Sequence, residues 1–84
     1  MENKVALIGI VVENFDEVSN LNAILHEYAD FIIGRMGIPY KKRDVSIISV
    51  AVDAPTDVIN ALSGKIGKLS GVTSKTVCAK IDEE

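Results

Sequence analysis

Two stretches of the chain are apolar at nearly every position. The first is residues 5–12 and the second is residues 45–52, where only Ser46 and Ser49 are polar. Successive side chains of a strand point to opposite faces, so a strand that is apolar throughout must be covered on both faces. We therefore predict that these stretches are the two central strands of one sheet. On the first strand, one face carries Val5, Leu7 and Val11 and the other carries Ala6, Ile8, Ile10 and Val12.

Between these strands, apolar residues recur at the three- and four-residue spacing of an amphipathic helix. The predicted helix covers residues 15–33, with a stripe formed by Phe15, Val18, Leu21, Leu25, Tyr28 and Ile32. Asn14 precedes it as an N-cap, and Glu17 follows three positions later, as in a capping box. Gly34 or Gly37 is expected to end it, because glycine readily takes the left-handed C-cap conformation.

A second helix follows the second apolar stretch. It opens at residues 54–57, where Pro55 suits the first helical position. Its buried stripe is predicted to consist of Val58, Ile59, Leu62, Ile66 and Leu69. Residues 38–42, which contain Pro39, and residues 72–81, which contain several polar side chains, have the character of edge strands.

The resulting order of elements is β-α-β-β-α-β over a single domain, residues 1–84. This is the α+β, ferredoxin-like pattern: a four-stranded antiparallel sheet in the order 4-1-3-2 with two helices. Right-handed crossovers place both helices on one face of the sheet. The other face would carry uncovered aliphatic side chains, so we expect another copy of the chain to cover it, in a homodimer or a tetramer.

Composition narrows the function classes. The net charge is −3, the pI is about 5.0, and there are two Phe, two Tyr and no Trp, which disfavours nucleic-acid binding. One cysteine and one histidine supply neither a disulfide nor a zinc site, so no metal or cofactor is expected. No apolar run approaches the ~20 residues of a membrane helix, and a reduced cytoplasmic protein is the default expectation.

Candidate binding residues lie on the second helix. Asn60, Gly64 and Gly67 fall opposite its apolar stripe when residues are placed at 100° intervals. A glycine inside a helix costs about 1 kcal/mol relative to alanine. Two of them therefore indicate the close approach of a partner helix, a backbone or a small ligand. The alternative that the helix ends near one of them, so that the glycines act as caps, stays open.

Asn14 and Phe15 are further candidates, because they occupy the loop after the first strand, where ligand sites often form; a simple helix cap is the competing explanation. The basic residues 41–43 either hold an anion or form a solvated hairpin turn. We expect His26 on the surface and Cys78 packed as a small hydrophobe. No nucleophile–base–orienter set is visible, so no catalytic residue is predicted.

Two segments resemble one family. They are residues 35–39, RMGIP, and residues 61–72, ALSGKIGKLSGV, which continue with Lys75, Thr76 and Val77. The second segment is the more specific, and the similarity extends over nearly the whole chain. With these motifs the chain resembles the small proteins called iron-only hydrogenase system regulators. That family is similar in fold to ACT domains and to the C-terminal domain of the nickel-responsive repressor, which form homo-oligomers.

The resemblance implies a regulatory role near hydrogenase maturation or expression. It does not extend to the nickel site of the repressor, which uses several histidines and a cysteine. No counterpart of the repressor's ribbon-helix-helix arm is expected, because the chain starts almost directly at the first strand. ACT domains bind amino acids near the loop after strand one, which corresponds here to Glu13, Asn14 and Phe15.

The sequence thus favours a non-enzymatic, ACT-like regulatory module that acts as a homo-oligomer, senses a small-molecule effector or docks a partner protein, and is linked to iron-only hydrogenase regulation. The alternative is a small dimeric ferredoxin-like-barrel enzyme with a pocket between sheet and helices. That enzyme would need buried polar groups, and the predicted helix faces offer mostly aliphatic side chains.

Overall fold

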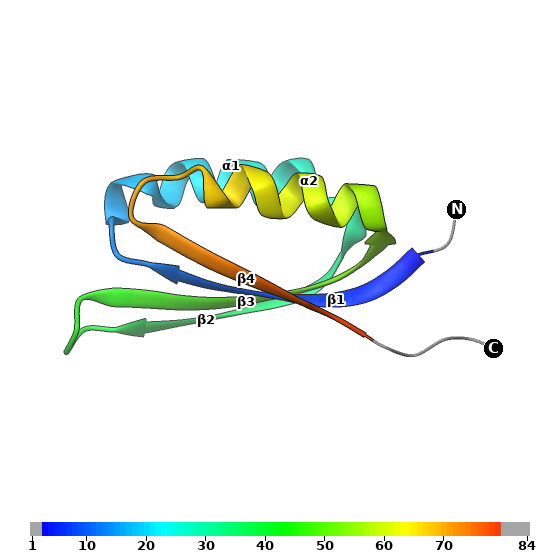
Figure 1. The fold of residues 1–84 in the computed structure, drawn as a ribbon. Coiled ribbons are helices and arrows are strands. Elements are labelled where there is room, and N and C mark those ends of the chain that lie inside the picture. The colour runs from blue at the N-terminus through cyan, green and yellow to red at the C-terminus, as the bar shows by residue number, and fades with distance from the viewer. Residues whose placement is uncertain (1–2, 80–84) are drawn as a thin grey trace.

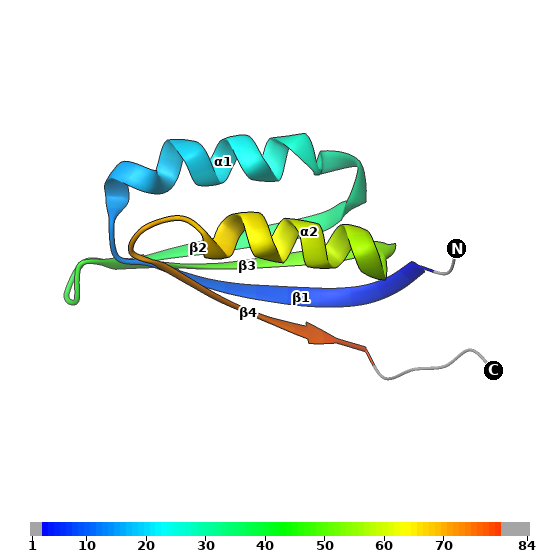
Figure 2. The same ribbon diagram turned by 45° about the horizontal axis from the view of Figure 1, so that its top comes forward.

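The structure, a computed structural model, describes residues 3–79. The elements in chain order are β1 (Asn3–Val12), η1 (Phe15–Glu17), α1 (Val18–Glu27), η2 (Ala29–Phe31), β2 (Ile32–Tyr40), β3 (Val45–Pro55), α2 (Thr56–Gly67) and β4 (Val72–Cys78). The strands pair antiparallel in the order β2-β3-β1-β4. Both helices lie on one face of this sheet (Figures 1 and 2). The predicted ferredoxin-like fold and its strand order are confirmed.

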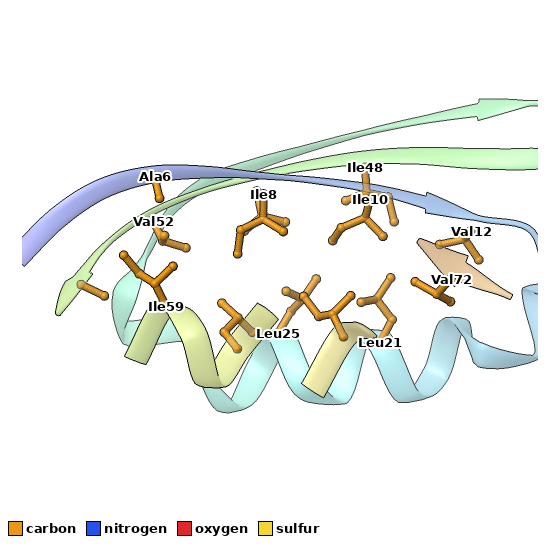
Figure 3. Close-up of a cluster of buried hydrophobic side chains, with 14 residues drawn as sticks. Ala6, Ile8, Ile10, Val12, Leu21, Leu25, Ile48, Val52, Ile59 and Val72 are labelled. Atoms are coloured by element: carbon orange, nitrogen blue, oxygen red, sulfur yellow. The ribbon is translucent and has the colours of Figure 1, made fainter. Parts of the chain in front are cut away.

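The core lies between the sheet and the two helices. Alternate residues of β1 point into it, as the sequence pattern predicts (Figure 3). The buried strand residues are Ala6, Ile8, Ile10, Val12, Ile48, Val50, Val52, Ala54 and Val72. The helices add Leu21, Leu25, Ile59, Leu62 and Ile66. Three of the five residues of the predicted α2 stripe are therefore buried, and the other two, Val58 and Leu69, are partly buried and pack against the core. Among residues 3–79 no polar or charged residue is buried.

The first helix is much shorter than predicted. It ends at Glu27, and β2 begins at Ile32, inside the segment assigned to the helix from periodicity. Gly34 and Gly37 lie within β2 and do not end the helix. The apolar residues around Ile32 fit either structure, and antiparallel pairing with β3 stabilises the strand.

The strand boundaries also differ from the predicted ones. β2 starts six residues before the predicted segment 38–42 and contains a register irregularity between Ile32 and Gly34. β3 continues to Pro55, which is the N-cap of α2 and not its first residue. β4 ends at Cys78, and the last two residues of the predicted segment 72–81 lie outside the described part of the chain. Pro39 is tolerated because β2 is an edge strand of the sheet formed by residues 3–79 and pairs there with β3 alone.

Asn14 caps the turn after β1, as predicted, although the turn is a 3-10 helix. Its Oδ1 accepts a hydrogen bond from the backbone N–H of Asp16 at 3.1 Å. The capping box is incomplete, because the carboxylate of Glu17 accepts a hydrogen bond from Asn20. The backbone N–H of Glu13 donates to the carbonyl of Gly71 at 2.7 Å and ties this loop to the start of β4.

Gly71 is a position where only glycine fits. Its φ is +71°, and an added Cβ would lie 2.6 Å from the Cβ of Asn14. We expect Gly71→Ala to lower the free energy of unfolding by about 1–3 kcal/mol, because left-handed strain and the contact with Asn14 add together. Urea denaturation followed by circular dichroism measures the change. Unchanged stability would show that the loop relaxes freely.

An ion pair joins the two helices on the surface. The Nζ of Lys65 lies 3.0 Å from a carboxylate oxygen of Glu27 and 5.1 Å from the ring centroid of Tyr28. The hydrogen bond to Glu27, followed by that to Tyr28, raises the pKa of the Lys65 amine above its ordinary value of 10.5. The pair therefore contributes its stabilisation below pH 10.5 and loses it as the pH rises further. Because the pair is exposed, its contribution is small.

Candidate functional site

The sheet face away from the helices, here called the outer face, is apolar over all four strands. Within residues 3–79 no helix or strand covers it, as Figure 1 shows. Its large side chains are 36% to 67% exposed: Val5, Leu7 and Val11 of β1, Met36, Ile38 and Tyr40 of β2, Ile47 of β3 and Val77 of β4. They account for eight of the ten exposed large hydrophobic residues of the described chain.

The sheet register arranges these side chains in rows. One row pairs Leu7 with Val77 on one side and with Ala51 on the other. A second row pairs Val11 with Ile47, which itself pairs with Ile38. Two apolar rows therefore run across the sheet, so the exposed aliphatic side chains of the outer face are grouped and not scattered.

Between these rows the outer face is formed by smaller and more polar residues. Ser49 pairs with Gly9 and with Met36, and Gly9 pairs with Lys75. Charge is confined to the margins, with Lys75 on edge strand β4 and Asp53 at the end of the β1–β3 pairing. The centre of the outer face is thus formed by the small residues Gly9 and Ser49, with larger aliphatic side chains in the rows on either side.

The candidate binding residues from the sequence fall into two separate groups. Asn14 contacts the turn at Gly71, and Phe15 starts η1 with a half-exposed ring. Asn60 and Gly64 lie on the exposed surface of α2, and Gly67 is its last residue. An added Cβ at Gly64 or Gly67 would meet no atom of the chain within 4 Å, so the described chain does not itself use the space beside these glycines.

A substitution of Gly64 shows whether a partner or ligand approaches the exposed surface of α2. It lies in the interior of α2 and has open space around its Cα. We expect Gly64→Ala to raise the free energy of unfolding by about 0.5–1 kcal/mol, because alanine loses less backbone entropy in a helix. Gly71→Ala is the matched control with the opposite expected sign. Loss of stability in Gly64→Ala at a protein concentration where copies associate would place a partner's backbone against this surface.

A hollow of about 310 Å³ lies between α1 and β2, where sequence patterns did not suggest a site. It is lined by Asn22, Leu25, His26, Ala29, Ile32 and Arg35. The Nη2 of Arg35 donates a hydrogen bond to the Oδ1 of Asn22 at 3.2 Å. None of the five predicted site residues lines it. An arginine in an edge strand is the sequence feature that could have indicated this hollow. It can be recognised only when the strand is known to include residue 35.

The remaining chemistry-bearing residues are solvent-exposed. His26 is exposed on α1, as predicted, and residues 41–44 form an exposed turn between β2 and β3. The expectation that Cys78 packs as a small hydrophobe is wrong: its thiol is free and exposed, because it ends edge strand β4. Residues 3–79 hold no group of three or more His, Cys, Asp or Glu side chains that could bind a metal ion.

Comparison with known proteins decides the family. Residues 4–76 match the TM1266-like family, which is described as "Iron-only hydrogenase system regulator, putative". The chain belongs to this family. The resemblance inferred from residues 61–72 is thereby confirmed.

A solved relative supports the assignment of this chain to the TM1266-like family. The uncharacterized protein TM1266 from Thermotoga maritima is 35% identical and superposes with a TM-score of 0.90, over 94% of this chain and 100% of that one. No curated protein sequence matches this TM1266-like chain. In its described part, no helix is both long and apolar enough to cross a membrane.

Proposed function

We propose that this TM1266-like chain is a non-enzymatic regulatory module of the iron-only hydrogenase system, and that it works as a homo-oligomer formed through its outer face. The observation that carries the proposal is the exposure of Leu7, Val77, Ile47 and their neighbours on a sheet whose other face packs against both helices. A monomer rarely exposes a continuous apolar patch larger than about 300–600 Å².

The area of the outer face suits a second copy of the chain. Eight large side chains, each about half exposed, present on the order of 700 Å², close to the ~800 Å² per partner of a stable interface. The outer face is also self-complementary in character. Its small central residues Gly9 and Ser49 can receive the large flanking side chains of another copy. Sheet-on-sheet packing of this kind builds a core about 10 Å thick.

Two observations favour a regulator over the alternative of a small enzyme. Over β1 and β3 the space between sheet and helices, where a ferredoxin-like-barrel enzyme would hold its substrate, is filled by aliphatic side chains (Figure 3), and the hollow between α1 and β2 lies outside this cluster. Within residues 3–79 that space contains no buried polar residue to orient or activate a substrate. The name of the family is also that of a regulator.

Sedimentation equilibrium of the full chain tests the assembly. We expect a dimer or tetramer at micromolar concentration, and a monomer there would refute the outer-face interface.

Disruption of the gene in its host tests the regulatory role. We expect altered abundance or activity of the iron-only hydrogenase, and unchanged transcript, maturation and activity would refute the link.

A further inference from the structure

We propose that the hollow between α1 and β2 binds a small monocarboxylate with a short aliphatic body. This inference goes beyond the proposed function, because the hollow lies on the helix side of the sheet and shares no residue with the outer face. Its volume of about 310 Å³ is at the lower end of the ~300–1,000 Å³ range of ligand pockets. The ligand is therefore a small molecule.

Arg35 is the cation of this site. In the sheet register it lies opposite Val50, whose side chain is fully buried on the helix side. Arg35 therefore points to the face of β2 that carries the core, beside α1, and not to the outer face. The hydrogen bond to Asn22 holds its guanidinium over the hollow. In residues 3–79 no carboxylate forms an ion pair with Arg35, so its fork of N–H donors is available to a carboxylate.

The other lining residues complete an amphipathic pocket. Asn22 and His26 are one helical turn apart on α1, so both side chains reach the same rim. Leu25, Ala29 and Ile32 supply the apolar part of the lining. None of the six lining residues is acidic. A lining that combines polar side chains, one positive charge and aliphatic side chains is complementary to one carboxylate attached to a short hydrocarbon chain.

Arg35 has a competing structural explanation. A charged residue that points inward on an edge strand can prevent other chains from pairing with that edge. If Arg35 only protects the edge, removal of its charge should cause aggregation. This role does not depend on Asn22, on the apolar lining of the hollow or on any ligand. Binding measurements on a soluble variant therefore separate the two roles.

The test is an NMR titration of the ¹⁵N-labelled full chain with sodium 3-methylbutanoate, compared with 3-methylbutanamide, the uncharged analogue of nearly equal shape. We expect saturable shifts of amide signals within residues 22–35 for the carboxylate and at least ten-fold weaker binding of the amide. Arg35→Gln should weaken carboxylate binding at least ten-fold, and Arg35→Lys should have an intermediate effect, because lysine keeps the charge but loses the planar fork.

Two controls complete the design. Arg43→Gln removes one positive charge from the exposed turn 41–44 and should leave carboxylate binding unchanged. A monomeric Leu7→Asp chain should still bind the carboxylate, so loss of the outer-face assembly is distinguishable from loss of this site. Equal affinity for acid and amide, shifts that do not saturate, or unchanged binding in Arg35→Gln would each overturn the proposal. Aggregation of Arg35→Gln with unchanged binding would assign Arg35 to edge protection alone.

Discussion

Leu7→Asp is expected to convert the proposed oligomer into folded monomers. Leu7 is 48% exposed and lies between Ala51 and Val77, within one of the apolar rows of the outer face. A carboxylate buried there without a partner would cost several kcal/mol, more than the ~2 kcal/mol that the leucine contributes by burial. Light scattering after size-exclusion chromatography should give the single-chain mass of 9.0 kDa at micromolar concentration.

Phe15→Asp is the matched control for this prediction. Phe15 is also 48% exposed, but it lies in η1, away from the outer face, where an acidic residue suits the first turn of a helix. The Phe15→Asp chain should keep the mass of the wild-type oligomer. If it dissociates as well, or if Leu7→Asp stays associated, the copies meet through another surface. Circular dichroism of both variants establishes that they are folded.

Ile8→Ala is expected to cause the largest loss of stability. Ile8 is fully buried on central strand β1, opposite Val50 and Thr76, and it faces the helices (Figure 3). Loss of its side chain leaves a cavity and should lower the free energy of unfolding by about 2–5 kcal/mol. Small domains are only marginally stable, with ~5–15 kcal/mol in total, so this loss would remove a large fraction of the stability. Urea denaturation measures the change.

The graded control is Ile8→Val, which removes a single methylene and should cost about 0.5–1.5 kcal/mol. All chains must be compared at one protein concentration, because association adds to the apparent stability of each. A loss below 1 kcal/mol in Ile8→Ala would mean that the residues around Ile8 close the cavity, and that this part of the core is loosely packed.

The central strands could be predicted from the sequence because their pattern has one physical explanation. Residues such as Ile8 and Val50 belong to stretches too apolar to face water on either side, and too short to cross a membrane. The inner and outer faces of β1 follow from strict alternation, and burial agrees at every position from Ala6 to Val12. The uncovered outer face also follows, once both helices are known to lie on one side.

The end of α1 could not be predicted because the sequence there satisfies two patterns. Ile32 continues the helical stripe, yet Ile32 and Ile33 are β-branched and begin an edge strand. Only pairing with β3, which is distant in sequence, decides between them. The same error concealed the hollow, since Arg35 lay between the predicted helix, residues 15–33, and the predicted strand, residues 38–42, and was not placed beside α1. The prediction that Cys78 is buried was wrong because residue type does not show which residues of an edge strand extend beyond the helix that packs on it.

The candidate residues Asn14, Phe15, Asn60, Gly64 and Gly67 stay predictions. Backbone geometry accounts for Asn14, which caps η1 and fits against Gly71. It does not account for Gly64, which lies in a helix interior with open space beside it. The stability of Gly64→Ala therefore carries more information about binding than any change at Asn14.

The wholly aliphatic interior has a consequence for the evolution of these proteins. Within residues 3–79 no buried polar residue fixes the identity of its neighbours, so Val, Ile and Leu can replace one another when the total volume is kept. Exchanges that keep the core volume therefore cost little stability, in agreement with a relative that shares 35% of its residues yet superposes with a TM-score of 0.90. Selection on function would then be most visible in comparisons of surface residues among many relatives.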